Sequence, residues 1–123
     1  MALSSIIAVA SVAGLRAGAE ETSAPNITAY GASKHAVIGL VRHAAVAYAK
    51  VGIRINAIAP GWHSTESFCL PNHWELEKFY AAFNPMGRVA AAREIKGLAV
   101  YLASNASSYV TGQVFIEDGG ETA

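Results

Sequence analysis

The chain has 123 residues, of which 53% are apolar and only 15% are charged, and its formal net charge is zero. A chain of this length forms one domain or part of one, and it is too apolar to be intrinsically disordered. A neutral chain has no general attraction for nucleic acid or for an anionic membrane surface, so we expect neither as a partner.

Cys69 is the single cysteine, so it can form neither a disulfide within the chain nor a thiolate metal cluster. This usage is typical of a reducing compartment, and a cytoplasmic location is expected. The apolar residues 2–13 are not preceded by the Lys or Arg of a signal peptide, and no apolar run reaches the ~18 residues of a membrane span. The histidines show no metal-binding spacing, so no metal site is predicted. They are His35, His43, His63 and His73.

The first element is expected at residues 4–10, SSIIAVA, a short apolar run without alternation. That pattern is typical of a strand buried on both faces inside a parallel sheet. Residues 14–26 are rich in Gly, Ser and acidic residues and contain Pro25, which predicts a loop.

Residues 28–50 form the longest helix-compatible segment of the chain. Asn26 or Thr28 is a suitable N-cap, and Gly52 follows the expected end of the helix. Two interior glycines each cost roughly 1 kcal/mol in helix propensity, so we expect a neighbouring element to approach this helix closely.

Residues 53–59, IRINAIA, are brief and β-branched and end at Pro60-Gly61, which predicts a second buried strand. The later segments are an irregular stretch at 62–73, an amphipathic helix at 74–83, a helix at 91–104 and a strand at 113–117. Strands that alternate with helices predict an α/β fold with a parallel sheet and helical crossovers. With about three strands, the two outer strands would be edges unless something covers them.

Tyr30 and Lys34 lie four residues apart on the predicted helix and therefore share one face. An ammonium beside a phenol favours the phenolate and lowers the phenol pKa from its usual value near ~10, and the positive end of a helix dipole acts in the same direction. Tyr30 would then exchange a proton with a substrate oxygen as a general acid or base. Taken alone, such a pair is more often an ordinary surface contact.

The neighbours of this pair make a site more plausible than a surface contact. Ser11 follows the first predicted strand, and Pro60-Gly61 follows the second. Ligands of open α/β sheets bind beyond the carboxyl ends of the strands, so we expect these residues to gather with Tyr30 on one rim of the sheet.

Five consecutive segments resemble landmarks of the short-chain dehydrogenase/reductases. They are IIAVASVAGL (6–15), YGASK (30–34), GIRINAIAPGW (52–62), GRV (87–89) and YLASNASSYVTGQVFIEDGG (101–120). The resemblance implies a Rossmann-like, doubly wound parallel sheet. It also implies that residues 1–123 are the C-terminal part of a single domain.

The resemblance assigns three catalytic residues. Ser11 is similar to the serine that holds and polarises the substrate oxygen, and Tyr30 to the acid/base. Lys34 is similar to the lysine that assists the tyrosine and binds the nicotinamide ribose, so Tyr30 and Lys34 would both contact the cofactor. The implied activity is hydride transfer between NADP or NAD and a small ketone or secondary alcohol.

Four further residues match positions at the nicotinamide in this family. Pro60, Gly61 and His63 are expected to line the nicotinamide, and Thr65 is expected near its carboxamide or a phosphate. The resemblance does not choose between NADP and NAD.

The sequence also departs from the family pattern. The glycine-rich phosphate loop is absent from these residues, so the chain is expected to lack the N-terminal nucleotide-binding half. Ala8 and Ala10 stand where the family often has Asn and Ser. The extra residues 19–25 lengthen the gap between Ser11 and Tyr30, which would displace Ser11.

Two functions therefore remain open. The first is an oxidoreductase that uses Tyr30 as its proton donor and acceptor. The second is a non-catalytic docking or oligomerisation module, in which the 28–50 helix packs against a second copy of the chain.

Overall fold

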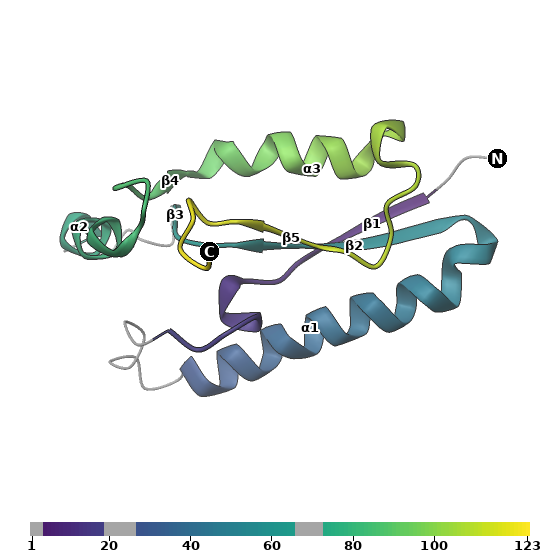
Figure 1. Cartoon of the computed structure of the whole chain (residues 1–123), viewed down its shortest axis with the longest axis horizontal. Helices are drawn as coiled ribbons and strands as arrows, with labels where there is room; N and C mark the ends of the chain where they lie inside the picture. The colour runs from purple at the N-terminus through teal and green to yellow at the C-terminus, as the bar shows by residue number, and fades with distance from the viewer. Residues whose placement is uncertain (1–3, 19–26, 66–72) are drawn as a thin grey trace.

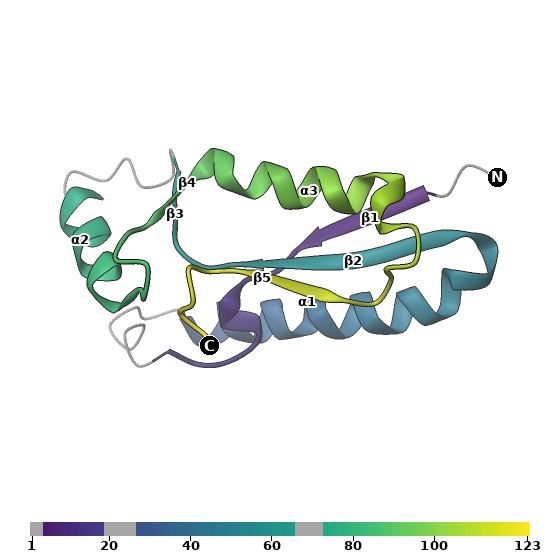
Figure 2. The same ribbon diagram turned by 45° about the horizontal axis from the view of Figure 1, so that its top comes forward.

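The computed structural model describes residues 4–18, 27–65 and 73–123. A three-stranded sheet lies between helix α1 on one face and helix α3 on the other (Figures 1 and 2). The elements are β1 (Ser4–Val9), α1 (Ile27–Tyr48), β2 (Ile53–Pro60), β3 (His63–Ser64), α2 (His73–Phe83), β4 (Ala90–Ala91), α3 (Ile95–Ala103) and β5 (Val114–Glu117). This arrangement confirms the predicted α/β class with helices on both faces of a parallel sheet.

The sheet has the strand order β1-β2-β5, and both pairings are parallel. Ser4 of β1 lies opposite Ile53 of β2, and the pairing runs in register to Val9 and Ile58. Because parallel strands end at the same edge, the residues that follow β1 and β2 meet on one rim.

The main core lies between α1 and the sheet. Ile38, Val41 and Ala45 of α1 pack in one buried cluster with Ile55 and Ala57 of β2. These α1 residues recur at helical spacing and form the buried stripe of the helix. Among the described residues, no helix is both long and apolar enough to cross a membrane.

The strand predicted at residues 4–10 is present, but the prediction that both its faces are buried is wrong. Ile6 and Val9 are 51% and 62% exposed. The reason is topological, since β1 is an outer strand and pairs only with β2 among the described strands. β2, the central strand, is buried over six consecutive residues as predicted.

The long helix begins at Ile27, so Thr28 lies within its first turn and the prediction that it caps the helix is wrong. The alternative cap, Asn26, lies outside the described residues. A short 3-10 turn follows the helix and ends at Gly52, whose φ of 79° is the left-handed conformation expected of a C-terminal glycine.

One short pairing was not predicted. His63–Ser64 lies within the stretch 62–73 that was expected to be irregular. It pairs with Ala90–Ala91 in a two-residue parallel ladder. The ladder brings the chain after β2 against the segment that leads into α3. It thereby fixes the residues that follow Gly61.

Candidate active site

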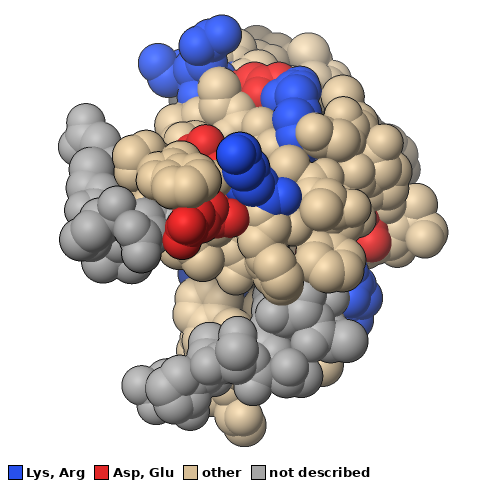
Figure 3. Space-filling view, turned by 90° about the vertical axis from the view of Figure 1, so that its left-hand side faces the viewer, with Lys and Arg blue, Asp and Glu red and all other residues tan. Residues whose placement is uncertain are grey.

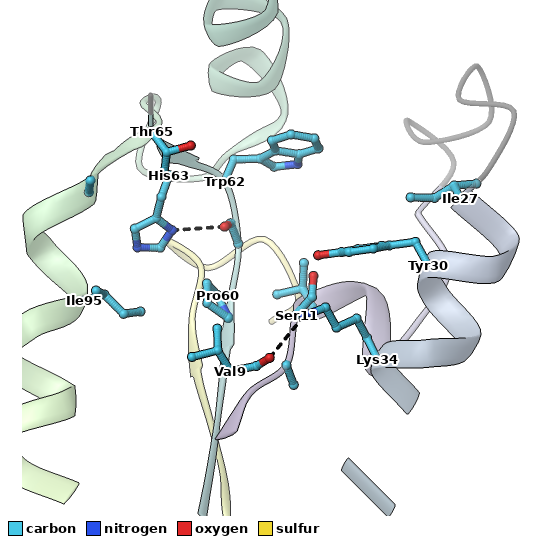
Figure 4. A pocket seen from close by; sticks show the side chains of 14 residues that line it. Val9, Ser11, Ile27, Tyr30, Lys34, Pro60, Trp62, His63, Thr65 and Ile95 are labelled. Atoms are coloured by element: carbon cyan, nitrogen blue, oxygen red, sulfur yellow. Dashed lines mark hydrogen bonds between the residues drawn. The ribbon is translucent and has the colours of Figure 1, made fainter. Parts of the chain in front are cut away.

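A cavity of about 630 Å³ opens where β1 and β2 end (Figure 4). All seven residues predicted for the site line it. They are Ser11, Tyr30, Lys34, Pro60, Gly61, His63 and Thr65. The prediction that Ser11, Tyr30 and Pro60-Gly61 gather on one rim of the sheet is confirmed, and the roles assigned to the seven residues stay predictions. The expected displacement of Ser11 by the longer loop does not remove it from the cavity.

Ser11 is positioned by the turn that follows β1. Its hydroxyl oxygen accepts a hydrogen bond of 3.1 Å from the Ala13 amide and caps the 3-10 turn Val12–Gly14. The residue is only 9% exposed. A hydroxyl that accepts at its oxygen keeps its O–H proton for donation, so the cap fixes Ser11 without consuming its donor.

Gly14 allows this turn to pack tightly on α1. A Cβ at Gly14 would lie 2.7 Å from the Lys34 carbonyl oxygen and 3.0 Å from the Ile38 Cδ1 atom. Only a glycine leaves room for that approach. The close contact fixes the distance between the turn that carries Ser11 and the helix that carries Lys34.

Lys34 bridges α1 and the end of β1. Its Nζ atom donates a 3.1 Å hydrogen bond to the Val9 carbonyl oxygen and lies 5.5 Å from the centroid of the Tyr30 ring. Figure 4 shows the Tyr30 hydroxyl pointing into the cavity from the first turns of α1. The ammonium group is therefore held close to the tyrosine by the carbonyl oxygen at the end of β1.

The Pro60-Gly61 turn is fixed by the C-terminal segment. The Gly61 amide donates to the Glu117 carbonyl oxygen at 2.9 Å, and a Cβ at Gly61 would lie 2.8 Å from the Asp118 Cβ atom. The turn after β2 thus packs directly against the end of β5. A side chain at Gly61 would push the two apart.

His63 is held between two acceptors. Its Nδ1 atom lies 3.0 Å from the Gly61 carbonyl oxygen, and its Nε2 atom lies 3.3 Å from a Glu117 carboxylate oxygen. Its side chain is only 9% exposed. The ring is therefore part of the structure that supports the Pro60-Gly61 turn, as well as a lining residue of the cavity.

The carboxyl group of Asp118 organises the turn behind the cavity. Partial burial opposes its ionisation, but hydrogen bonds from the Thr122 hydroxyl and from the Gly120 and Thr122 amides outweigh that effect, and Arg16 adds its charge. Together they hold the pKa of Asp118 below its ordinary value.

Charge is evenly mixed around the rim. Figure 3 shows Lys and Arg interspersed with Asp and Glu on the face at the carboxyl ends of the strands. One pair there, Arg88 and Glu94, is joined by hydrogen bonds of 2.7 and 2.8 Å, which lower the pKa of Glu94 to about 2. Within residues 4–18, 27–65 and 73–123, no three potential ligands gather as a metal site.

The sequence analysis left several lining residues unassigned. They are Val9, Ala10, Val12, Ile27, Trp62, Ala92 and Ile95. All seven are apolar, and Val12, Ile27 and Trp62 lie outside the predicted helices and strands. The sequence position of Trp62 could have indicated a place at the cavity, because it directly follows Pro60-Gly61. The positions of Ala92 and Ile95 gave no such indication, because the β3–β4 ladder that brings their segment to the cavity has no recognisable sequence pattern.

The same sequence features are found in known proteins. The sequence model of the family described as enoyl-(acyl carrier protein) reductase matches residues 2–122. Short-chain dehydrogenase fogB of Aspergillus ruber is 44% identical over 102 residues, which cover 81% of this chain and 37% of that protein. The 2,5-dichloro-2,5-cyclohexadiene-1,4-diol dehydrogenase of Sphingobium indicum is 40% identical over 121 residues, or 97% of this chain and 46% of that protein.

Solved structures agree with these relatives. A gluconate 5-dehydrogenase from Burkholderia cenocepacia, in complex with NADP and tartrate, superposes with a TM-score of 0.85 at 34% identity over 98% of this chain and 45% of that chain. A 4-hydroxyisoleucine dehydrogenase complexed with NADH superposes with a TM-score of 0.79 at 34% identity over 96% of this chain and 46% of that chain. The chain spans less than half the length of these relatives. With a family match across residues 2–122, it belongs to the short-chain dehydrogenase/reductase family.

Proposed function

We propose that this chain contributes the proton-transfer side of an NADP- or NAD-dependent oxidoreductase that interconverts a ketone and a secondary alcohol. One observation carries the proposal: a single cavity of about 630 Å³ is lined by Ser11, Tyr30, Lys34 and the Pro60-Gly61 turn. A family match alone would not bring these side chains together.

In this proposal Tyr30 gives its phenolic proton to the substrate oxygen during reduction and takes it back during oxidation. The positively charged neighbour of Tyr30 is Lys34, whose ammonium group the Val9 carbonyl oxygen holds beside the tyrosine ring. Ser11, anchored by its cap to Ala13, donates to the same oxygen as negative charge develops on it.

The residues present fit the nicotinamide end of the cofactor. The cavity offers a Lys34 ammonium and a Thr65 hydroxyl as polar partners, beside the apolar surface of Pro60 and Ile95. Bound NADPH or NADH would supply the hydride. The chain's own part is to hold the cofactor ring beside the substrate and to exclude water.

The glycine-rich loop that normally binds the pyrophosphate does not occur in this sequence. We therefore expect chain 1–123 to bind NADPH no more tightly than millimolar, and assays need saturating cofactor. The activities after which the relatives are named do not select one substrate, because they include a chlorinated cyclohexadiene diol and gluconate. A small carbonyl or alcohol is the shared chemistry.

The decisive variant is Tyr30→Phe, which removes only the hydroxyl. We expect its turnover at saturating cofactor to fall by about 100-fold or more, because general acid–base catalysis typically contributes at least that factor. Affinity for NADPH, titrated by fluorescence, should stay within about twofold. Tyr109→Phe is the matched control, since Tyr109 is fully exposed. Undiminished turnover in Tyr30→Phe would refute the assignment of the proton donor.

A second function, docking onto a second copy, is favoured by the outward face of α1. Leu40 and Val46 are 69% and 81% exposed there, and a second helix packed on this face would bury both. If the chain associates through α1, binds no cofactor and converts no carbonyl compound, the result would support this second function.

The cytoplasmic location remains a prediction. It rests on the single cysteine, and Cys69 lies outside the described residues.

A further inference from the structure

The side chain of Asn84 ties the end of α2 to the end of β5. α2 lies beyond the carboxyl ends of the sheet strands (Figure 1), and all of its residues, His73–Phe83, are at least partly exposed. Asn84 directly follows this helix. Its Nδ2 atom donates a 2.7 Å hydrogen bond to the carbonyl oxygen of Asp118, which lies 34 residues away in the sequence. The helix end is thus joined to the segment that closes the sheet.

Asn84 is itself held by its neighbours in the chain. Its Oδ1 atom accepts a hydrogen bond of 2.9 Å from the Met86 amide, and its backbone carbonyl oxygen accepts one of 2.8 Å from the Gly87 amide. A side-chain amide has one acceptor end and one donor end, and here each end faces a partner of the opposite kind. The donor is therefore aimed at Asp118 by a turn whose own hydrogen bonds lie within residues 84–87.

The segment that Asn84 reaches also packs against Gly61. The Glu117 carbonyl oxygen accepts from the Gly61 amide at 2.9 Å, and a Cβ at Gly61 would lie 2.8 Å from the Asp118 Cβ atom. At the next position, a Cβ at Gly119 would lie 2.5 Å from the Asn84 Oδ1 atom. Asn84 and Gly61 thus both contact one short stretch of backbone, and close packing leaves neither much room to move alone.

We propose that Asn84 is a positioning residue of the active site: through the Asp118 backbone it sets the place of Gly61, although it does not line the cavity itself. This inference rests on the proposed function, which takes the Pro60-Gly61 turn as a wall of the nicotinamide site. A misplacement of about 1 Å by a change far from the chemistry can slow a reaction by about 100-fold. A single hydrogen bond outside the cavity is therefore able to affect turnover.

Two variants remove the donor and keep the turn of Asn84. Asn84→Ser retains an oxygen that can accept from the Met86 amide, but its hydroxyl is too short to reach the Asp118 carbonyl oxygen. Asn84→Asp retains the shape of the side chain and covers the case in which Asn84→Ser fails to fold. Asn105→Ser is the matched control, because Asn105 is exposed in the turn that follows α3.

The first measurement reports the place of Gly61 without any turnover. In amide proton–nitrogen correlation spectra of chain 1–123, the Gly61 proton reports its hydrogen bond to Glu117. The Ala57 proton, bonded to the Gln113 carbonyl oxygen at 2.8 Å, reports the middle of the same strand. In both Asn84 variants we expect the Gly61 proton to shift upfield, because its hydrogen bond is weaker, and the Ala57 proton to stay in place. The control should leave both unchanged.

The second measurement is kcat with saturating NADPH and cyclohexanone, at equal folded fraction by circular dichroism. We expect both Asn84 variants to lose at least about tenfold, within the range that a small misplacement of reacting groups costs. The pH profile of kcat should keep its shape, because Tyr30 and Lys34 are unchanged. Asn105→Ser should turn over like the parent chain.

A Gly61 proton that stays in place in both variants would overturn the inference. An equal shift at Gly61 and Ala57 would overturn it as well, because it marks general loosening of the fold. A displaced Gly61 with undiminished kcat would show that Asn84 does not position the reaction. The proposed function fails separately: if the parent chain transfers hydride to no ketone, the oxidoreductase proposal falls, and the Gly61 shift still decides whether Asn84 sets the turn.

Discussion

At the scale of single residues, the site depends on two glycines that allow close packing. Gly14 has no room for a Cβ beside the Lys34 carbonyl, and Gly61 has none beside Asp118. At Gly39, in contrast, an added Cβ would meet no other element within 4 Å in the part of the chain that the structure describes. The expectation that a neighbouring element approaches this helix closely is confirmed at Lys34, where the turn of Gly14 packs, but the contact does not involve Gly39. A Cβ at Gly31 would lie 3.5 Å from the Ala13 carbonyl oxygen, which is an ordinary contact.

This contrast yields a matched pair of variants. Gly14→Ala should lower the free energy of unfolding by about 1–3 kcal/mol, because overpacking displaces the turn of Ser11 from α1. Gly39→Ala should raise it by about 0.5–1 kcal/mol, since alanine favours the helix. Urea denaturation of both variants checks the signs. Equal effects in the two variants would contradict the packing argument.

Asp118 gives a second residue-scale prediction, with a definite pH dependence. Its pKa is lower in the folded chain than its ordinary value near ~3.9, so its contribution to stability is present above that value. The contribution disappears as the pH falls through the lowered pKa. Asp118→Asn should therefore melt below the parent chain at about pH 7, and the difference should shrink below about pH 4.

The melting curves need a control for charge alone. Glu75→Gln removes one negative charge from an exposed position in the first turn of α2. Its melting temperature should follow that of the parent chain within about 1 °C at both pH values, as expected for a surface substitution. A gap between Asp118→Asn and the parent chain that persists undiminished in acid would refute the account of the turn.

At the scale of elements, Arg54 ties β2 to the end of α3. It is only 7% exposed and donates hydrogen bonds of 2.9 Å to the Leu102 carbonyl oxygen and to the Ser107 hydroxyl. A further bond of 3.2 Å reaches the Ser104 carbonyl oxygen. A cation at a helix C-terminus also faces the negative end of the helix dipole. Arg54 thus satisfies carbonyls that the last turn of α3 cannot satisfy itself.

Arg54→Met should lower the free energy of unfolding by about 3 kcal/mol, because it removes the buried guanidinium that hydrogen-bonds the Leu102 and Ser104 carbonyls and the Ser107 hydroxyl. Lys96→Met, on the exposed side of α3, is the control and should change it by no more than about 0.5 kcal/mol. Chemical denaturation measures both. A small effect of Arg54→Met would show that water replaces the guanidinium.

Most of the elements, and the place of the site, could be predicted because they rest on strong local patterns. β2 is a continuous apolar run, and the carboxyl ends of parallel strands must share an edge, so Ser11 and Pro60 had to lie near each other. The exposure of β1 could not be predicted, because it depends on which strands neighbour it. The β3–β4 ladder could not be predicted either, since two residues carry no periodicity.

At the scale of the whole molecule, two of the surfaces that present apolar side chains to solvent belong to β1 and α1. One is the outer edge of β1, with Ile6 and Val9, and the other is the outward face of α1, with Leu40 and Val46. The buried core lies between them, with α1 packed on β2. Association with another chain through α1 would leave the cavity open, whereas association along β1 would cover Val9, which lines it.

Leu40→Glu tests association through α1. If two copies pack through this helix, a buried carboxylate should weaken dimerisation by at least about tenfold, as measured by sedimentation equilibrium. Tyr109→Glu is the control, because Tyr109 is fully exposed and lies beyond α3. A chain that sediments as a monomer at every concentration would refute association through α1.

The central position of β2 has a consequence for how the molecule can be studied. Its amides are hydrogen-bonded within the sheet and flanked by β1 and β5, so their exchange with solvent deuterium requires global unfolding rather than local opening. Any ligand that binds only the folded state stabilises it and slows that exchange by the factor 1 + L/Kd, where L is the free ligand concentration. The deuterium uptake of one buried strand therefore measures ligand binding at a site that the strand only borders.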